Sequence, residues 1–168
     1  MITVLVRVER GAEALAATLA SLVPGVVAGL VADAVVLAEE PSGDVVRLAG
    51  VAGAALVIDR KGAWASAAAI ARREWVWCFL DGDAPDGDWI RTVGQFVSLA
   101  PMEGWTLGRP KYRPLSPSAR TARLIEKVVG SRRVRAGDLV RRNRLALPVF
   151  RVRPAPLGTV VARGPAFR

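Results

Sequence analysis

A chain of 168 residues, 52% of them hydrophobic, can bury the core of one globular domain over residues 1–168, and this composition excludes intrinsic disorder. The sequence contains one cysteine and no histidine, which excludes an internal disulfide framework, the usual zinc sites and catalytic triads that contain histidine. The net charge of +9 favours anionic partners, and any metal would be bound by oxygen atoms.

The chain begins with a strand followed by a helix. The segment ITVLVRV alternates and is rich in β-branched residues, which predicts a first strand. Leu15, Leu19 and Leu22 then recur at helical spacing. The dipeptide Pro24-Gly25 predicts the end of this helix. The order of strand and helix is that of a βα unit.

Two features near the N-terminus bear on location. Residues 14–38 are apolar enough to be considered as a membrane span, but Pro24-Gly25 interrupts them and Asp33 lies inside them. A helix, a turn and a strand therefore explain this run better than a span. The first residues are too few and too soon charged for a secretory signal, so we expect a cytoplasmic protein.

Strands and helices continue to alternate up to residue 100. The segments DAVVLAEEPSGD and AALVID each predict a strand, the first ending in a polar turn. Residues 62–74 are alanine-rich and predict a helix with Arg72 and Arg73 in its last turn. WVWCFL predicts a fully buried strand that contains Cys78. One further helix is predicted by five apolar residues on a single helical face, namely Trp89, Ile90, Val93, Phe96 and Val97.

This pattern predicts an α/β fold with a mostly parallel sheet and helices on both faces, because strands that are apolar on both sides need cover on both sides. In such sheets ligands bind at the carboxyl ends of the strands. The loops that follow the strands are therefore where a functional site is expected.

The last third of the chain is basic. Residues 1–108 carry 8 Lys/Arg and 13 Asp/Glu, whereas residues 109–168 carry 16 and 2. GWTLGRPKY predicts a strand and PSARTARLIEKVVG an amphipathic helix. A solvated basic surface without a dedicated ligand is one interpretation, and peripheral contact with an anionic membrane surface is another. Nucleic acid is not expected as a partner, because no recognition helix or aromatic RNA-binding signature accompanies the charge.

The loop after the third long apolar strand carries two aspartates, Asp81 and Asp83, separated by a glycine. Carboxylates at the end of a buried strand suit a divalent cation such as Mn²⁺ or Mg²⁺, whose coordination the phosphates of a substrate complete. The alternative is an ordinary turn. We prefer that alternative for Asp86 and Gly87, with Asp88 capping the helix that starts at the next residue.

Three segments of residues 2–100 resemble the family 2 glycosyltransferases, which have the GT-A fold. They are the opening ITVLVRVERGAEALAATLASL, the strand and turn DAVVLAEEPSGD, and GAWASAAAIARREWVWCFLDGDAPDGDWI with its Asp-x-Asp loop. The resemblance implies metal-dependent transfer of a sugar from a nucleotide-diphosphate sugar. Asp83 would bind the Mn²⁺ or Mg²⁺ that bridges the diphosphate, and Asp81 would hold the ribose or a metal-bound water. Glu39 or Asp44 would lie near the nucleoside.

The resemblance also implies two functional halves. Residues 1–100 would bind the donor, and residues 101–168 would form a shortened, basic acceptor half. Sugar transfer with inversion needs a carboxylate base that deprotonates the acceptor hydroxyl. AGDLVRRNR is similar to an acidic segment of the family and would make Asp138 that base and Arg141 or Arg142 a phosphate partner. Trp105 lies where an acceptor would pass. The acceptor is not identified by the sequence, and a non-catalytic binding relative or a basic module that binds anionic membranes or nucleic acid stays an alternative.

Overall fold

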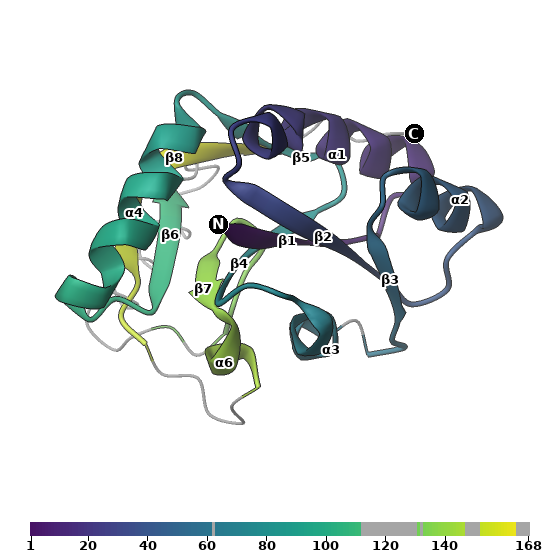
Figure 1. Ribbon diagram of the computed structural model, residues 1–168. Helices are drawn as coiled ribbons and strands as arrows, with labels where there is room; N and C mark the ends of the chain where they lie inside the picture. The colour runs from purple at the N-terminus through teal and green to yellow at the C-terminus, as the bar shows by residue number, and fades with distance from the viewer. Residues whose placement is uncertain (62, 112–130, 132, 147–151, 164–168) are drawn as a thin grey trace, which may run out of the picture.

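The computed structural model describes residues 1–61, 63–111, 131, 133–146 and 152–163, which form one eight-stranded mixed sheet with helices on both faces (Figure 1). The strand order in space is β3-β2-β1-β4-β7-β6-β8-β5. The strands are β1 (Ile2–Arg7), β2 (Val31–Ala38), β3 (Ala55–Ile58), β4 (Trp75–Leu80), β5 (Asp83–Asp86), β6 (Leu107–Lys111), β7 (Leu139–Arg141) and β8 (Ala155–Arg163).

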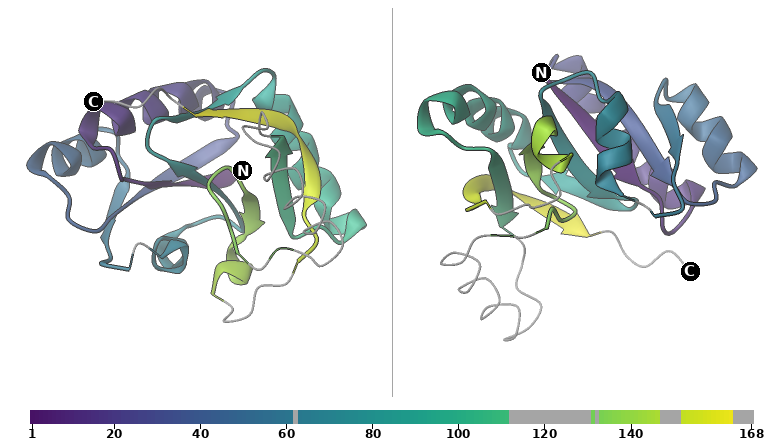
Figure 2. Two further views of the ribbon diagram at one scale, coloured as in Figure 1. Left: turned by 180° about the vertical axis from the view of Figure 1, so that it is seen from behind. Right: turned by 90° about the horizontal axis from the view of Figure 1, so that it is seen from below.

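One half of the sheet is parallel and the other is mixed. Strands β3, β2, β1 and β4 pair in parallel, as the alternation of strands and helices predicts. Beyond β4 the pairings of β7 with β4 and with β6 are antiparallel, β6 and β8 run parallel, and β5 is antiparallel to β8. The last strand of the described chain, β8, thus returns beside β6 and α4 (Figure 2).

The helices divide between the two faces of the sheet. They are α1 (Ala12–Val27), α2 (Gly43–Val51), α3 (Trp64–Ile70), α4 (Trp89–Glu103) and α6 (Arg142–Leu145). One buried cluster joins α1, α2 and α4 to one face, through residues such as Leu15, Val45 and Val93. The opposite cluster joins α3 to the other face through Ala67 and Ala68. The predicted cover on both faces is therefore present.

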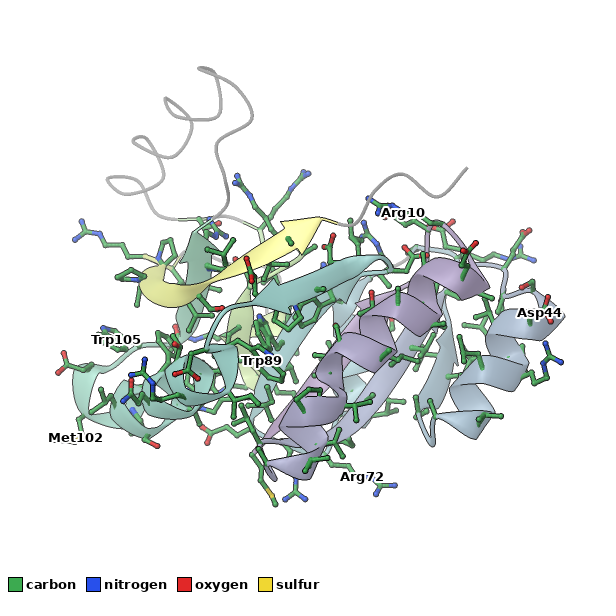
Figure 3. The ribbon with its side chains drawn as sticks, turned by 90° about the horizontal axis from the view of Figure 1, so that it is seen from above. Arg10, Asp44, Arg72, Trp89, Met102 and Trp105 are labelled. Carbon is green, nitrogen blue, oxygen red and sulfur yellow. The ribbon has the colours of Figure 1, made fainter. Side chains whose placement is uncertain are left out.

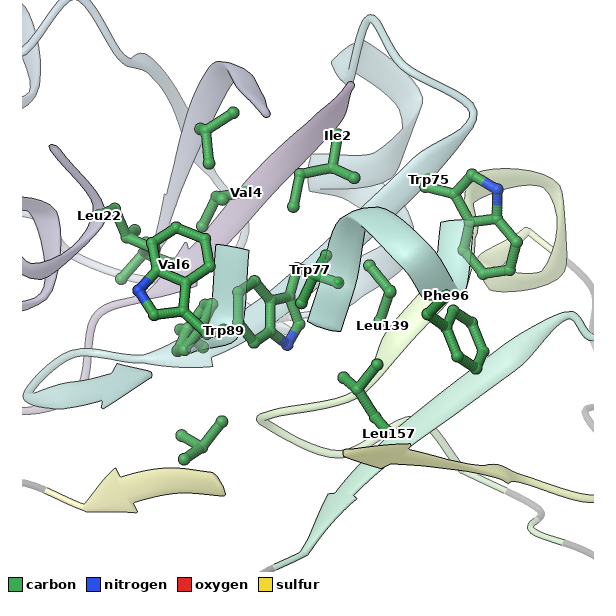
Figure 4. Packing of buried hydrophobic residues seen from close by; sticks show 14 of the residues in the cluster. Ile2, Val4, Val6, Leu22, Trp75, Trp77, Trp89, Phe96, Leu139 and Leu157 are labelled. Carbon is green, nitrogen blue, oxygen red and sulfur yellow. The ribbon is translucent and has the colours of Figure 1, made fainter. Parts of the chain in front are cut away.

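Aromatic residues fill the larger cluster. The Trp77 ring lies 5.4 Å from that of Trp89, and Trp75 meets Phe96 edge to face at 5.7 Å (Figure 4). Trp105 stacks on Phe96 at 5.2 Å and is partly buried against this cluster. Such rings bury large apolar areas, so they fix how α4 lies on the sheet.

The first helix is longer than the sequence predicts, because Pro24 lies inside its last turn and α1 continues to Val27. Proline at this place removes one N–H donor from the helix. Packing maintains the last turn: a Cβ atom at Gly25 would come within 2.2 Å of the Trp89 ring, so the backbone of α1 lies directly against that side chain. No helix in the described part of the chain has the length and apolar character of a membrane span.

Four further local interpretations are corrected. Asp86, predicted to lie in a turn, is the last residue of β5, which pairs with β8. The sequence analysis missed α2, although Ser42 caps it by accepting a hydrogen bond from the N–H of Val45. Helix α3 ends at Ile70, so Arg72 and Arg73 lie beyond it instead of in its last turn. Asp88 is the N-cap residue of α4, but its carboxylate binds Arg91 at 2.5 Å and makes no cap hydrogen bond. The predicted helix at 117–130 lies outside the described residues.

Candidate functional site

The loops at the carboxyl ends of the parallel strands meet at one edge of the sheet, which we call the carboxyl edge. Backbone hydrogen bonds extend the pairing past the strand ends, from the N–H of Val8 to Leu37, of Asp59 to Ala38, and of Asp81 to Arg7. Figure 3 shows Arg10 and Asp44 at this edge and Arg72 at the opposite edge. This arrangement is the one in which α/β sheets bind ligands.

Asp81 holds the loop that follows β1. Its side chain is fully buried. Oδ1 accepts a hydrogen bond of 3.0 Å from the backbone N–H of Glu9, and Oδ2 accepts bonds of 2.6 and 2.9 Å from the N–H groups of Arg10 and Gly11. Three donors use most of the acceptor positions of one carboxylate. The structure therefore gives Asp81 a contact that sequence reasoning did not foresee, and its predicted role toward ribose or metal stays a prediction.

Asp83 is also fully buried, at the start of β5. The N–H of Leu80 approaches its Oδ2 at 3.4 Å, and its backbone carbonyl accepts a bond of 2.9 Å from the hydroxyl of Thr18. That hydroxyl in turn accepts a bond of 2.8 Å from the N–H of Gly82, whose positive φ of 83° favours glycine. Helix α1 therefore fixes the turn that separates the two aspartates.

Glu39 and Asp44 lie on the loop between β2 and α2 and on the first turn of α2. Both are exposed. The Asp44 carboxylate pairs with Arg47 of the same helix at 2.8 Å. The structure therefore brings the Glu39 loop and the Asp81 loop to the same edge, while the described contacts of Asp44 are within α2. Their predicted place near a nucleoside stays a prediction.

The loop before α3 completes this edge. Asp59 accepts hydrogen bonds from the backbone N–H of Lys61 at 2.8 Å and from the hydroxyl of Ser66. These bonds, that of Ser66 first, lower the pKa of the Asp59 carboxyl. They hold the loop so that Trp64, the first residue of α3, lies over the guanidinium of Arg7, whose Cζ is 5.3 Å from the ring centroid.

Arg7 was not singled out from the sequence. It is the last residue of β1, its side chain is 31% exposed, and one of its Nη atoms pairs with Glu9. Its Nε atom is buried and has no hydrogen-bond partner among the described residues. The sequence could have pointed to Arg7, because it is a cation at the carboxyl end of a predicted parallel strand, where ligands bind.

Asp138, the predicted base, is fully buried beside β7. Its two oxygens accept bonds of 2.8 Å from Nε and 2.7 Å from Nη2 of Arg109, and the N–H of Arg135 donates a further bond of 2.9 Å. Burial raises the pKa of Asp138, and the bonds from Arg109 oppose this rise. This geometry is that of a buried ion pair that joins β6 to β7. The base role stays a prediction that the pairing does not favour.

Cys78 is fully buried in β4, as predicted, and burial is the main cause that raises the pKa of its thiol well above the ordinary value. Trp77 is likewise in the core, and its indole N–H donates to the carbonyl of Gly137 at 2.8 Å. Both side chains therefore belong to the buried core, as predicted.

The described residues do not fit a metal site that the protein builds alone. They contain no group of three or more Asp, Glu, Cys or His side chains that could hold a metal ion. Asp81 is already bound by three N–H groups, and Asp83 is buried. Whether Asp83 binds a metal together with the phosphates of a substrate stays a prediction.

The chain is similar in structure to glucosyl-3-phosphoglycerate synthase from Mycobacterium tuberculosis. Its crystal structure with Mn²⁺ and UDP-glucose matches with a TM-score of 0.68 at 18% sequence identity, over 98% of this chain and 71% of the synthase chain. The complex with Mn²⁺, UDP-glucose and phosphoglyceric acid gives 0.65 and 18%, over 98% and 72%. A mycobacterial protein matches with a TM-score of 0.63 at 18% identity, over 98% and 68%.

No protein-family model matches the chain, and no curated protein matches its sequence. At the sequence identity of the solved structures, a likeness of this extent shows a shared fold. The α/β chain described here therefore has the GT-A fold that the resemblance implies.

Proposed function

We propose that the protein binds a nucleotide-diphosphate sugar at the carboxyl edge and transfers the sugar to an acceptor. The observation that carries this proposal is the likeness over 98% of the chain to an enzyme crystallised with UDP-glucose and Mn²⁺. The position of the loops supports it, because the parallel strands of the chain end at an edge suited to ligand binding.

The donor would contact the loops after β1, β2 and β4. Asp81 would keep the loop after β1 in place through three backbone N–H bonds. Glu39 and Asp44 would lie near the nucleoside, and Asp83 near the diphosphate. Neighbouring structures contain Mn²⁺ or Mg²⁺ with UDP, so a divalent ion that arrives with the donor is part of the proposal for Asp83.

Sugar transfer needs stabilisation of the leaving diphosphate and a base for the acceptor hydroxyl. The predicted base, Asp138, is paired with Arg109, and the donor contacts proposed above involve other residues. The same pairing favours a second candidate function, a binding protein with the fold of a transferase and without its catalysis. The acceptor in one neighbouring structure is phosphoglyceric acid, which makes a small phosphorylated acid the first acceptor to test.

The test has two stages. In the first, UDP- and GDP-sugars are added with Mn²⁺ or Mg²⁺, and the melting temperature is measured; we expect it to rise with one donor, and the rise to vanish in Asp83→Ala. No rise with any nucleotide sugar contradicts the proposal. In the second, release of the nucleoside diphosphate is measured with and without phosphoglyceric acid. Binding without release identifies the non-catalytic alternative.

Contact with an anionic membrane through residues 109–168 stays a prediction. Sedimentation with vesicles that contain an anionic lipid, compared with neutral vesicles, tests it directly. Binding only to the anionic vesicles, weakened by salt, is the expected result.

A further inference from the structure

The guanidinium of Arg7 is a cation held at the carboxyl edge in a fixed orientation. The ring of Trp64 covers it at 5.3 Å. Stacking on an aromatic face orients a guanidinium while leaving the hydrogen-bonding edge of its plane available. Arg7 ends β1 beside Leu80, the last residue of β4, so this cation lies next to the loop that carries Asp81 and Asp83.

The hydrogen bonds of Arg7 are incomplete among the described residues. A guanidinium has five N–H donors. The described hydrogen bond and ion pair of its side chain join one Nη atom to Glu9, whose side chain is 47% exposed, and its Nε is buried without a partner. An ion pair this exposed is weak, because water screens it. A stronger anion could therefore displace the Glu9 carboxylate at little cost.

We propose that Arg7 receives the diphosphate of the bound nucleotide. This inference rests on the proposed function and adds to it the residue that neutralises the phosphates. In the free protein Glu9 pairs with the guanidinium; in the complex phosphate oxygens take its place. Planar recognition of phosphate by two N–H groups is the geometry in which arginine binds most strongly.

The hydrogen bonds of Asp81 favour a role for such a cation. A diphosphate needs positive charge, which two aspartates of an Asp-x-Asp loop would supply by binding a metal. In this chain the carboxylate of Asp81 is bound by the backbone of residues 9–11. A protein cation at the end of the neighbouring strand would add positive charge at the same edge, beside any divalent ion that Asp83 binds with the donor.

The chain offers a matched control in Arg141. This residue also lies over a tryptophan, Trp75, at 5.5 Å and pairs with a glutamate, Glu74, at 3.3 Å. Its Nε is likewise buried without a partner among the described residues. Arg141 differs from Arg7 in position, since it pairs with Trp75, the first residue of β4, at the amino edge of the sheet. This position does not fit the phosphate contact that the resemblance implies for Arg141. Arg141→Gln therefore removes an equivalent guanidinium far from the carboxyl edge.

The experiment measures binding of UDP and of uridine by calorimetry, first with EDTA and, if UDP does not bind, with Mn²⁺. GDP and guanosine are used if GDP binds more tightly. Arg7→Gln should weaken diphosphate binding about 30-fold, the loss expected for a charge-assisted hydrogen-bond pair, and leave nucleoside binding within about twofold. Glu9→Gln should strengthen diphosphate binding about threefold, because it removes the competing carboxylate. Arg7→Lys should restore part of the affinity, and Arg141→Gln should leave it unchanged.

Three results would overturn the assignment. If Arg7→Gln binds UDP as the unaltered protein does, the phosphates lie elsewhere. If it weakens uridine and UDP equally, Arg7 supports the edge instead of contacting phosphate. If the unaltered protein binds no nucleotide with or without metal, the proposed function is wrong and the assignment falls with it. Melting curves of each variant show whether a loss of binding is a loss of folding.

Discussion

The Asp81 carboxylate at the end of β4 accepts a hydrogen bond of 2.6 Å from the backbone N–H of Arg10, which lies in the loop after β1. Two neighbouring loops at the carboxyl edge are thus joined by a side chain and a backbone that are 71 residues apart in sequence. Because the bond is to the backbone, the shape of the loop depends on Asp81 and not on the side chain of Arg10. These hydrogen bonds therefore hold the backbone of the loop after β1 against the end of β4.

Asp81→Ala should destabilise the protein by about 3 kcal/mol, since it leaves N–H groups of the loop without a charged acceptor. Denaturant unfolding measures this loss. Hydrogen exchange at Glu9, Arg10 and Gly11 should accelerate more than exchange elsewhere, because these are the N–H groups that Asp81 binds. Uniform acceleration along the chain would show that the carboxylate supports the whole fold instead of one loop. Asp86→Ala, an exposed change in β5, is the control.

Asp138→Ala should cost about 3–5 kcal/mol, because it leaves the largely buried guanidinium of Arg109 without its carboxylate. Replacing both residues, as Arg109→Met with Asp138→Leu, should recover most of this loss. Unfolding of the two single variants and the double variant gives the coupling energy. A double variant as unstable as the sum of the single variants would mean that the pair is not a stabilising unit. Asp44→Ala, which breaks an exposed pair, should have no measurable effect.

The pH dependence of stability follows from the direction of the Asp138 pKa. Burial raises this pKa above 3.8, with Arg109 opposing the rise. The folded state then binds more protons than the unfolded state, so the contribution of Asp138 to the free energy of unfolding falls as the pH rises from 3.8 through the raised pKa. The contribution of Asp138 is the difference between the free energies of unfolding of the unaltered protein and of Asp138→Asn, measured over this pH range. A contribution that grows with pH would show that Arg109 outweighs burial.

Gly25→Ala should destabilise the protein by about 2 kcal/mol, since the added methyl group overlaps the Trp89 ring at 2.2 Å. Gly50→Ala, in α2, is the matched change: nothing lies within 4 Å of its Cβ position, so a gain of about 0.5 kcal/mol is expected from the better helix former. Thermal unfolding distinguishes the two. A smaller ring in Trp89→Phe should relieve the cost of Gly25→Ala, and no relief would mean that α1 is strained by Pro24 instead.

The sequence predicts the parts of the fold that depend on local periodicity. Strands β1, β2 and β4 and helix α4 are long, apolar and regular, and the structure confirms each of them. The end of α1 could not be predicted, because contact of Gly25 with Trp89, 64 positions along the chain, accounts for the turn that contains Pro24. Helix α2 carried a readable signal in Ser42 followed by Val45, Leu48 and Ala49 at helical spacing.

The candidate site, like the fold, could be predicted from the sequence only in part. The position of Asp81 and Asp83 at the end of a buried strand was predictable, because it needs only the apolar run before them. Their partners were not, since the backbone of residues 9–11 and the hydroxyl of Thr18 come from other elements. The pairing of Asp138 with Arg109 spans 29 residues and gives the predicted base a partner that no short motif reveals.

The most direct test of the central claim is a titration of the isotopically labelled protein with UDP-glucose, followed by the backbone amide signals. Donor binding at the carboxyl edge predicts shifts concentrated in residues 7–11, 38–42 and 80–83, with little change at the amino edge around Glu74. Shifts confined to other parts of the chain would contradict donor binding at the carboxyl edge. The absence of shifts at every donor concentration tested would contradict it as well.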